Sequence, residues 1–175
     1  QKMSKTEIVR VENLKKYFPV EKSFLEKLLT RTRSFVRAVD GVTFSVRKGE
    51  VFTLAGESGC GKTTTGKLVL KLIPPTSGKV FFKDQEITKL GPEELRLLRR
   101  KMQIIFQDPY ASFNPRMRIG DAVGHPLEIH GLASGEEKRK RVLAMLERVG
   151  LSPPEQFIEL YPHQLSGGQR QRAAM

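Results

Sequence analysis

The sequence VFTLAGESGCGKTTTGKLVLKLI, at residues 51–73, decides the fold class. Its first five residues, 51–55, form a short apolar run, which predicts a buried β-strand. The glycines that follow predict a loop. Residues 62–72 then predict a helix whose apolar stripe includes Leu68 and Leu72. A strand, a glycine-rich loop and a helix in this order are typical of an α/β fold.

Residues 56–63 read Gly-Glu-Ser-Gly-Cys-Gly-Lys-Thr, which matches the phosphate-binding loop pattern in full. Glycines let backbone N–H groups curl around phosphate oxygens. Lys62 would neutralise the β- and γ-phosphates of a nucleotide, Thr63 would bind Mg²⁺, and Thr64 would bond the α-phosphate side. The predicted nucleotide contacts are Gly56, Glu57, Ser58, Gly59, Cys60, Gly61, Lys62, Thr63 and Thr64.

Residues 165–169 read Leu-Ser-Gly-Gly-Gln and predict a second anion-binding turn. Ser166 stands where a helix N-cap is expected, and such a turn presents backbone N–H groups and the positive end of a helix dipole. The turn has no lysine, and the chain already holds a complete phosphate-binding loop. The sequence therefore predicts half of a site that is shared with another molecule.

The segments around the two motifs predict antiparallel strands first and helices later. Residues 35–39 and 42–46 predict a hairpin that turns at Asp40-Gly41. Other strands are predicted at residues 8–17, 79–82 and 102–106, the last of them buried. Helices are predicted at residues 92–100, at residues 119–130 and from Ser134, where Glu137 completes a capping box and Gly150 provides the C-cap.

Composition limits the class of protein. The 175 residues are 38% hydrophobic and 29% charged, which suits one globular domain with an insert. No apolar run approaches the ~20 residues that cross a bilayer. Cys60 is the single cysteine, which fits a reducing compartment. The net charge of +12 fits nucleic acid, an anionic membrane, nucleotide phosphates or a solvated surface, but the basic residues are too spread out for one duplex-binding stripe.

Three single residues carry weaker signals. Gln107 follows a predicted core strand, where ligands bind in open α/β sheets, and would reach Mg²⁺ or an attacking water. Tyr17 ends the first strand, where its ring would stack on an adenine or simply pack on the surface. Cys60 is either a reactive thiol beside Lys62 or a small filler, and we favour the filler.

Together these residues resemble the nucleotide-binding domain of ATP-binding cassette (ABC) transporters, over about residues 7–175. Residues 56–63 resemble the Walker A motif and residues 165–169 resemble the family signature. Gln107 corresponds to the Q-loop glutamine, and Tyr17 to the adenine-stacking aromatic residue. Residues 106–115, Phe-Gln-Asp-Pro-Tyr-Ala-Ser-Phe-Asn-Pro, and the basic insert before Ala38 further resemble oligopeptide and dipeptide importer ATPases, with nickel or glutathione as other substrates.

The resemblance implies an α/β fold with a P-loop NTPase (RecA-like) core, an antiparallel β subdomain and a helical subdomain, incomplete at its C-terminal side. One partial ABC ATPase domain would span residues 1–175. The core and β subdomain would occupy about residues 1–107, the helical subdomain about residues 108–165, and the start of the signature helix residues 166–175.

The resemblance also implies an importer subunit that binds ATP and Mg²⁺ and powers transport by cassette dimerisation. Lys62 and Gln107 would be catalytic, with Thr63 and Gln107 on the metal. A second cassette, identical or paralogous, would place its nucleotide against Leu165, Ser166, Gly167, Gly168 and Gln169. Integral-membrane permease subunits would be the other partners, at the cytoplasmic face of the membrane, and no direct nucleic-acid contact is expected.

The family places its Walker B aspartate, catalytic glutamate and switch histidine after the signature. The 175 residues hold no carboxylate after Glu159. We therefore expect a longer parent protein to hydrolyse ATP and this chain alone to bind it without turnover. We also expect residues 51–55 to lack a neighbouring strand and to expose apolar surface. The alternatives are a non-transport ATPase of the same superfamily and a module that only binds ATP.

Overall fold

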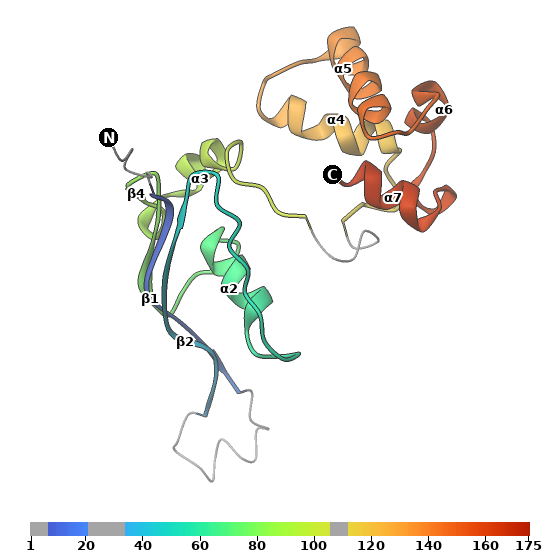
Figure 1. The fold of residues 1–175 in the computed structure, drawn as a ribbon. Helices are drawn as coiled ribbons and strands as arrows, with labels where there is room; N and C mark the ends of the chain where they lie inside the picture. The colour runs from blue at the N-terminus through green and yellow to red at the C-terminus, as the bar shows by residue number, and fades with distance from the viewer. Residues whose placement is uncertain (1–6, 21–33, 106–111) are drawn as a thin grey trace, which may run out of the picture. The chain divides into compact units, whose positions relative to one another are not determined.

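A computed structural model describes residues 7–20, 34–105 and 112–175 (Figure 1). Its contacts divide the chain into two compact units, Gln1–Met102 and Gln103–Met175. The first unit consists of a β-sheet with short helices, and the second consists of helices. The chain is therefore mixed α/β with an antiparallel sheet, as the sequence predicts.

The first unit is built on a four-stranded sheet with the order β2-β1-β3-β4, in which every neighbouring pair is antiparallel. The central strand β1 pairs with β2 along one edge and with β3 along the other. The predicted strands at residues 8–17 and 79–82 are confirmed. The strands are β1 Glu7–Pro19, β2 Phe35–Arg47, β3 Ser77–Phe82 and β4 Gln85–Glu86.

The predicted hairpin at Asp40-Gly41 is wrong, because β2 runs through both residues as one strand. Leu14 of β1 faces Val42, whereas the next residue, Lys15, faces Asp40. Gly41 is thus the extra residue of a β-bulge, and its φ of +77° is one that glycine adopts at no steric cost. β1 is long enough to pair with both halves of β2, so the chain gains more backbone hydrogen bonds by continuing than by turning back.

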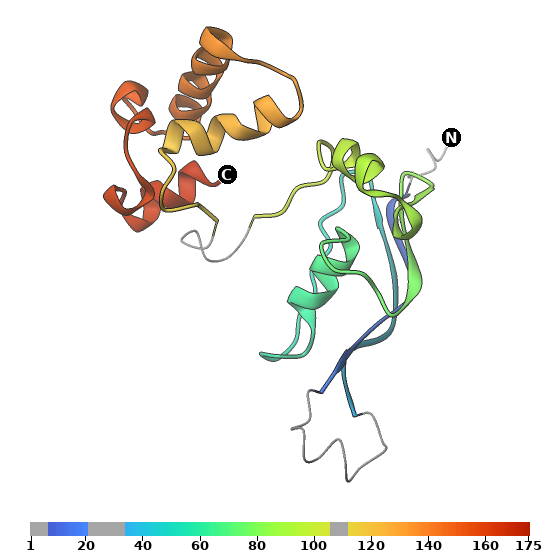
Figure 2. The ribbon, with the colours of Figure 1, turned by 180° about the vertical axis from the view of Figure 1, so that it is seen from behind.

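The helices α2 (Lys62–Val69) and α3 (Pro92–Leu98) supply apolar side chains to the core of this sheet. In both ribbon views α2 lies beside the sheet (Figures 1 and 2). Helix α2 ends at Val69, earlier than predicted, and Leu72 stays exposed. A short 3₁₀ helix, η1 (Ile87–Lys89), also contributes to the core. The buried members are Val11, Leu14, Val39, Leu68, Val80, Phe82, Ile87 and Leu98.

The prediction of buried strands at residues 51–55 and 102–106 is wrong. Neither forms a strand in the described residues, and Phe106 lies outside them. Val51 is 92% exposed and Ile105 is 63% exposed. A buried parallel strand needs hydrogen-bonded neighbours, and no described strand pairs with either segment. The exposed apolar surface expected at residues 51–55 is confirmed, although Phe52 stacks on Phe44 with ring centroids 4.6 Å apart.

The second unit is a cluster of short helices around its own core. Val142 and Leu146 of α5 are buried in this core. Gly150 follows α5 with a φ of +74°, as expected of a C-terminal cap. The helices are α4 Ile119–Ile129, α5 Gly135–Arg148, α6 Pro154–Ile158, the 3₁₀ helix η2 Pro162–Gln164, and α7 Gly167–Ala173.

The predicted capping box at the start of α5 is wrong. Ser134 is the N-cap residue, but its side chain makes no capping hydrogen bond. The Glu137 carboxylate instead accepts a hydrogen bond from Arg141 Nε at 2.8 Å, one turn further along the same helix. A charged i,i+4 pair on the exposed face thus replaces the reciprocal contact with the N-cap.

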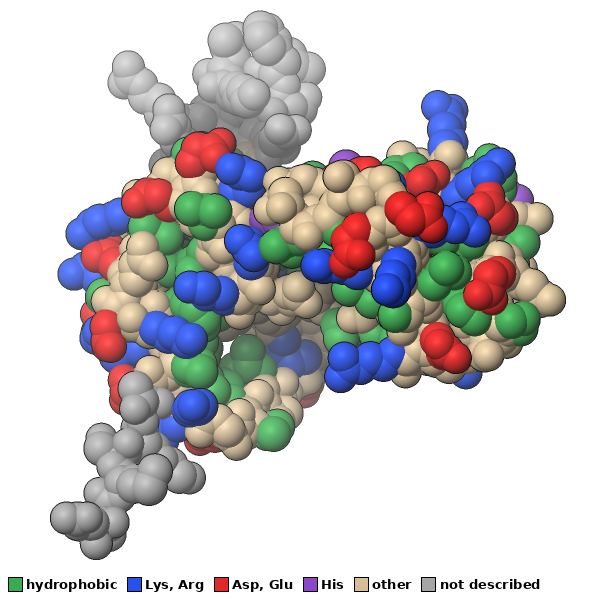
Figure 3. All heavy atoms as spheres, turned by 90° about the horizontal axis from the view of Figure 1, so that it is seen from above, with side chains coloured by type: hydrophobic (Ala, Val, Ile, Leu, Met, Phe, Trp, Pro, Cys, Tyr) green, Lys and Arg blue, Asp and Glu red, His purple; other side chains and the backbone are tan. Residues whose placement is uncertain are grey.

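The surface carries both signs of charge. On the face drawn in Figure 3, Lys and Arg side chains are interleaved with Asp and Glu side chains rather than gathered in one stripe. Across the ranges that the structure describes, no helix combines the length and the apolar character that crossing a bilayer requires.

The tight packing of Gly78 in β3 gives a test of the sheet. Its φ is +93°, and an added Cβ would lie 2.4 Å from the carbonyl oxygen of Asn13 in β1. We expect Gly78→Ala to lower the free energy of unfolding by about 2–4 kcal/mol, from backbone strain and the clash together. Urea denaturation followed by circular dichroism measures the change.

Gly66→Ala in α2 is the matched control, because a Cβ there meets no atom within 4 Å. Alanine favours a helix over glycine, so we expect this variant to be more stable by about 0.5–1 kcal/mol. Equal destabilisation by both substitutions would contradict the close approach of β3 to β1.

Candidate functional site

The glycine-rich loop lies close over strand β2. Gly59 and Gly61 have φ values of +83° and +95°. A Cβ on Gly61 would lie 2.2 Å from the carbonyl oxygen of Ala38, and one on Gly56 would lie 2.7 Å from the sulfur of Cys60. The loop can therefore follow this path only with glycine at these positions.

Gly61 is also the N-cap residue of α2, and this helix start is left open. Its first internal hydrogen bond runs from Thr65 N to Gly61 O at 2.8 Å. No side chain caps the helix and its first turn holds no acidic residue. The N–H groups of Lys62, Thr63 and Thr64 precede the first helical bond, so they and the positive end of the helix dipole suit an anion.

The ammonium group of Lys62 is turned back onto the loop. Its Nζ donates to the carbonyl oxygens of Gly56 at 2.7 Å and Glu57 at 2.6 Å, and it lies 3.5 Å from the sulfur of Cys60. The cation thus stands within the curl of residues 56–60, all of which are exposed. An ammonium beside exposed backbone N–H groups is the donor set that a polyphosphate requires.

The hydroxyl groups after Lys62 divide into two kinds. Thr63 is exposed and Thr64 is half-buried, which leaves them available to a ligand and its metal. Thr65 is 5% exposed and its Oγ1 donates to Gly61 O at 3.0 Å, so it stabilises the helix start. Oxygen donors of this kind fit Mg²⁺, and the described residues contain no cluster of three His, Cys, Asp or Glu side chains that would form a separate metal site.

Tyr17 lies near the end of β1, and its hydroxyl donates to Oδ1 of Asp40 at 2.5 Å. This hydrogen bond raises the pKa of Tyr17 above its ordinary value of 10.0 and lowers the pKa of Asp40 below 3.8. The guanidinium carbon of Arg37 lies 5.7 Å from the centre of the Tyr17 ring. Sequence reasoning missed Asp40 as a partner, because it assigned Asp40 to a turn instead of a strand.

Gln107, the predicted link between the nucleotide and the helical segment, lies outside the described residues. The same holds for residues 106–111 of the importer-like stretch and for residues 21–33 of the basic insert. The roles of these residues stay predictions.

Residues 165–169, called the signature turn below, lead into α7, and Ser166 is its N-cap residue as the sequence predicts. Ser166 Oγ accepts from Gln169 N at 3.3 Å, and Gln169 Oε1 accepts from Ser166 N at 2.9 Å, which is a complete capping box. An added Cβ on Gly167 or Gly168 would meet no atom within 4 Å, so the glycines leave an open surface. Leu165 is buried in the core of the second unit and anchors the turn.

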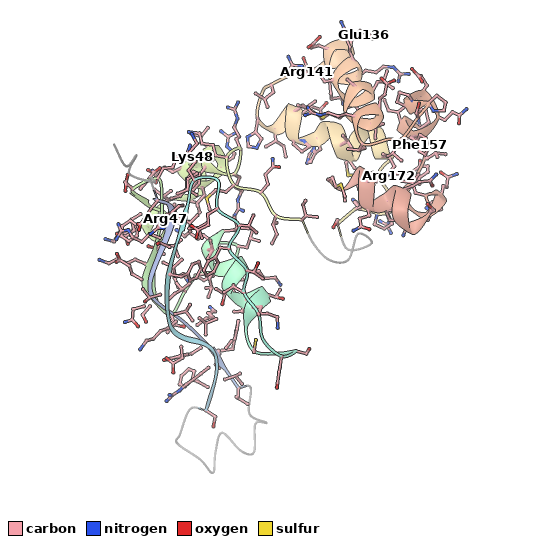
Figure 4. The ribbon with its side chains drawn as sticks, in the orientation of Figure 1. Arg47, Lys48, Glu136, Arg141, Phe157 and Arg172 are labelled. Atoms are coloured by element: carbon pink, nitrogen blue, oxygen red, sulfur yellow. The ribbon has the colours of Figure 1, made fainter. Side chains whose placement is uncertain are left out.

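Arg170 is a residue that sequence reasoning missed. It is 3% exposed, and its Nη2 donates to the carbonyl oxygen of Leu165 at 2.7 Å. It therefore ties the first residue of the turn to the helix that follows. Its neighbour on α7, Arg172, is exposed and is labelled in Figure 4. The sequence offers no pattern that separates the buried arginine from the exposed one.

The structure brings the predicted residues together in two groups. Tyr17 and the glycine loop belong to the first unit, and the signature turn belongs to the second. Within the loop, Lys62 contacts Gly56, Glu57 and Cys60. Cys60 is exposed and its sulfur lies beside the Lys62 ammonium, so the choice between a reactive thiol and a small filler stays a prediction.

The sequence matches known proteins over nearly its whole length. The profile of the family described as "ABC transporter" matches residues 39–175. "Glutathione import ATP-binding protein GsiA" of Escherichia coli (strain K12) is 47% identical over 165 residues, which are 94% of this chain and 26% of that protein. "Oligopeptide transport ATP-binding protein AppF" of Bacillus subtilis (strain 168) is 43% identical over 166 residues, 94% of this chain and 49% of that protein. The chain thus spans about a quarter of the first relative's length and about half of the second's.

Solved structures agree with this match. The dimeric structure of MJ0796, described as a bacterial ABC transporter cassette, has a TM-score of 0.78 and 30% identity, covering 95% of this chain and 67% of that one. CbiO1 from Clostridium perfringens, described as part of the ABC transporter complex cbiONQ, has a TM-score of 0.67 and 25% identity. That match covers 97% of this chain and 59% of the other.

The capping box at Ser166 can be tested by comparison with Ser134, the N-cap residue of α5, whose side chain makes no capping hydrogen bond. We expect Ser166→Ala to destabilise α7 by about 0.5–2 kcal/mol, the usual loss when an N-cap oxygen is removed. Hydrogen exchange measured by mass spectrometry would then show faster exchange of the α7 amides. Ser134→Ala should leave the exchange of α5 nearly unchanged, because that side chain makes no cap bond. Equal acceleration in the two helices would contradict this difference.

Proposed function

Because the chain belongs to the ABC transporter family, we propose that it is the ATP-binding part of an importer subunit for small peptides. The glycine loop carries this proposal. It combines left-handed glycines at positions 59 and 61, an uncapped helix start and the ammonium of Lys62 in one exposed turn. The relatives named for glutathione import and oligopeptide transport support peptides as the transported class.

Each residue of the loop has a distinct role in this proposal. The backbone N–H groups at residues 59–63 bind phosphate oxygens, and Lys62 leaves the carbonyl oxygens of Gly56 and Glu57 to neutralise the β- and γ-phosphates. Thr63 provides an oxygen ligand for Mg²⁺, with Gln107 as a second. When bound, Mg²⁺ withdraws electron density from the phosphate oxygens. Tyr17 stacks on the adenine base.

The signature turn acts on a second cassette in the same proposal. Its open glycines and the start of α7 would contact the nucleotide that the partner's loop holds. MJ0796 was solved as a dimer, and a related structure is described as dimeric with ADP and Pi bound, which supports a paired arrangement. CbiO1 is described as part of a transporter complex, which supports permease subunits at the membrane as further partners.

Binding of ATP is tested with Lys62→Ala and the matched variant Lys67→Ala on the same helix. Loss of the charge-assisted hydrogen bonds of Lys62 should weaken the affinity for Mg-ATP by about ten- to hundred-fold. Lys67 lies in the last turn of α2, so its removal should leave the affinity unchanged. Isothermal titration calorimetry measures both affinities. An unchanged affinity in Lys62→Ala would contradict the proposed site.

Turnover is a separate proposal. This chain binds ATP without hydrolysing it, because no carboxylate follows Glu159 in its sequence to polarise an attacking water. A phosphate-release assay on purified chain should give the same rate for the unmodified protein and for Lys62→Ala. Steady-state release that Lys62→Ala abolishes would contradict this proposal and show that the 175 residues include a sufficient catalytic set.

A further inference from the structure

We infer that Asp40 is a positioning residue for nucleotide binding, because its carboxylate fixes the ring of Tyr17 in the orientation that receives the adenine base. The inference rests on the proposed ATP site. It adds a residue that belongs neither to the glycine loop nor to the signature turn. It also assigns a function to the β-bulge at Gly41.

The pairing of β1 with β2 brings the two side chains together. Lys15 faces Asp40 in this pairing, and Tyr17 faces Arg37. Residues 15 and 17 are two apart, so their side chains lie on the same face of the strand. Because Asp40 faces Lys15, the Tyr17 side chain can reach along that face to Asp40. The hydroxyl meets Asp40 Oδ1 at 2.5 Å, a short distance typical of a hydrogen bond to a carboxylate.

The β-bulge determines which residue faces Lys15. Gly41 has a φ of +77°, and a Cβ on it would lie 3.3 Å from the side-chain oxygen of Asn13. The pairing passes from Leu14 and Val42 to Lys15 and Asp40, so Gly41 has no partner of its own. In a regular ladder Gly41 would face Lys15 and Asp40 would face Lys16, so the Asp40 side chain would point to the opposite face.

The backbone of Tyr17 is held independently of its hydroxyl. Tyr17 N donates to Thr76 Oγ1 at 2.9 Å, and Thr76 N donates to Lys15 O at 2.8 Å. Lys16 Nζ donates to Pro74 O at 2.7 Å, so the segment after α2 is tied to β1 at three points. The ring is thus fixed at both ends, by Thr76 at the backbone and by Asp40 at the hydroxyl. An aromatic ring ordered before binding loses less rotamer freedom when a base stacks on it.

Asp40 also orders the cation on the ring. Arg37 Nη1 lies 3.5 Å from Asp40 Oδ2, and its guanidinium carbon lies 5.7 Å from the ring centre. The cation stands over one face of the ring and so directs a stacking base to the other face. Tyr17 is half-buried, which leaves part of its surface accessible to a ligand.

The test compares the affinity for Mg-ATP with that for inorganic tripolyphosphate, which has no base, by calorimetry. We expect Asp40→Ala to weaken ATP binding by about two- to ten-fold, the range of one lost hydrogen bond, and to leave tripolyphosphate binding unchanged. Tyr17→Phe should cause a loss no larger than that of Asp40→Ala, because the carboxylate also pairs with Arg37 and Lys15. The double variant should lose no more than Asp40→Ala alone, since the hydrogen bond that Tyr17→Phe removes is already absent there. Asp40→Asn, which keeps an acceptor oxygen, should recover part of the affinity.

Glu12→Gln is the matched control, since Glu12 is a half-buried carboxylate on β1 that pairs with Arg10 instead of Tyr17. It should change neither affinity. Tyr17 should ionise above pH 10 in the unmodified chain and nearer its ordinary value in Asp40→Ala, as read from the absorbance difference against Tyr17→Phe. This readout reports the contact itself.

Several outcomes would overturn the inference. Additive losses from Tyr17→Phe and Asp40→Ala, an equal loss for tripolyphosphate, or ordinary titration of Tyr17 in the unmodified chain would each do so. If Lys62→Ala loses ATP binding while Asp40→Ala retains it fully, only the role of Asp40 fails. A chain that binds neither ligand would overturn the proposed ATP site and the inference together.

Discussion

The pairing of β1 with strands on both of its edges is the constraint on which the first unit depends. Its backbone bonds to β2 on one side and to β3 on the other, so every side chain along β1 has a determined face. Val11 and Leu14 point into the core, and Tyr17 reaches Asp40. A shift of one residue in this register would move every β1 side chain to the opposite face of the sheet. Val11 and Leu14 would then leave the core, and Tyr17 would no longer reach Asp40.

The same pairing positions the glycine loop. Gly61 passes so close to Ala38 of β2 that a side chain has no room, and the loop therefore takes its place from the sheet. Helix α2 begins at this point, with its N–H groups uncapped. The helix is then held by Leu68 in the core beneath it. The anion-binding turn is thus held by three kinds of contact, which are strand pairing, the close backbone approach to β2 and the packing of α2 in the core.

Local sequence patterns succeeded where the deciding contacts are local. Ser166 and Gln169 are three residues apart, and the N-cap predicted there is present. Local sequence patterns failed where a residue far away in the chain determines the secondary structure. The apolar run at 51–55 has the composition of a buried strand, but a strand is stabilised only by a neighbour that completes its hydrogen bonds. At Ser134, which has the same spacing to Glu137 as Ser166 has to Gln169, a second local partner competes, because the Glu137 carboxylate accepts a hydrogen bond from Arg141 one turn further along the helix.

The sequence by itself determined the family, the phosphate-binding loop and the signature turn, because each consists of a few adjacent residues whose chemistry needs no distant partner. Only the tertiary structure decided that Asp40 lies in a continuous strand and accepts the hydroxyl of Tyr17, and that Arg170 is buried while Arg172 is exposed. The reason is that strand register and core packing join residues far apart in the chain. Such contacts leave no periodic trace in the local sequence.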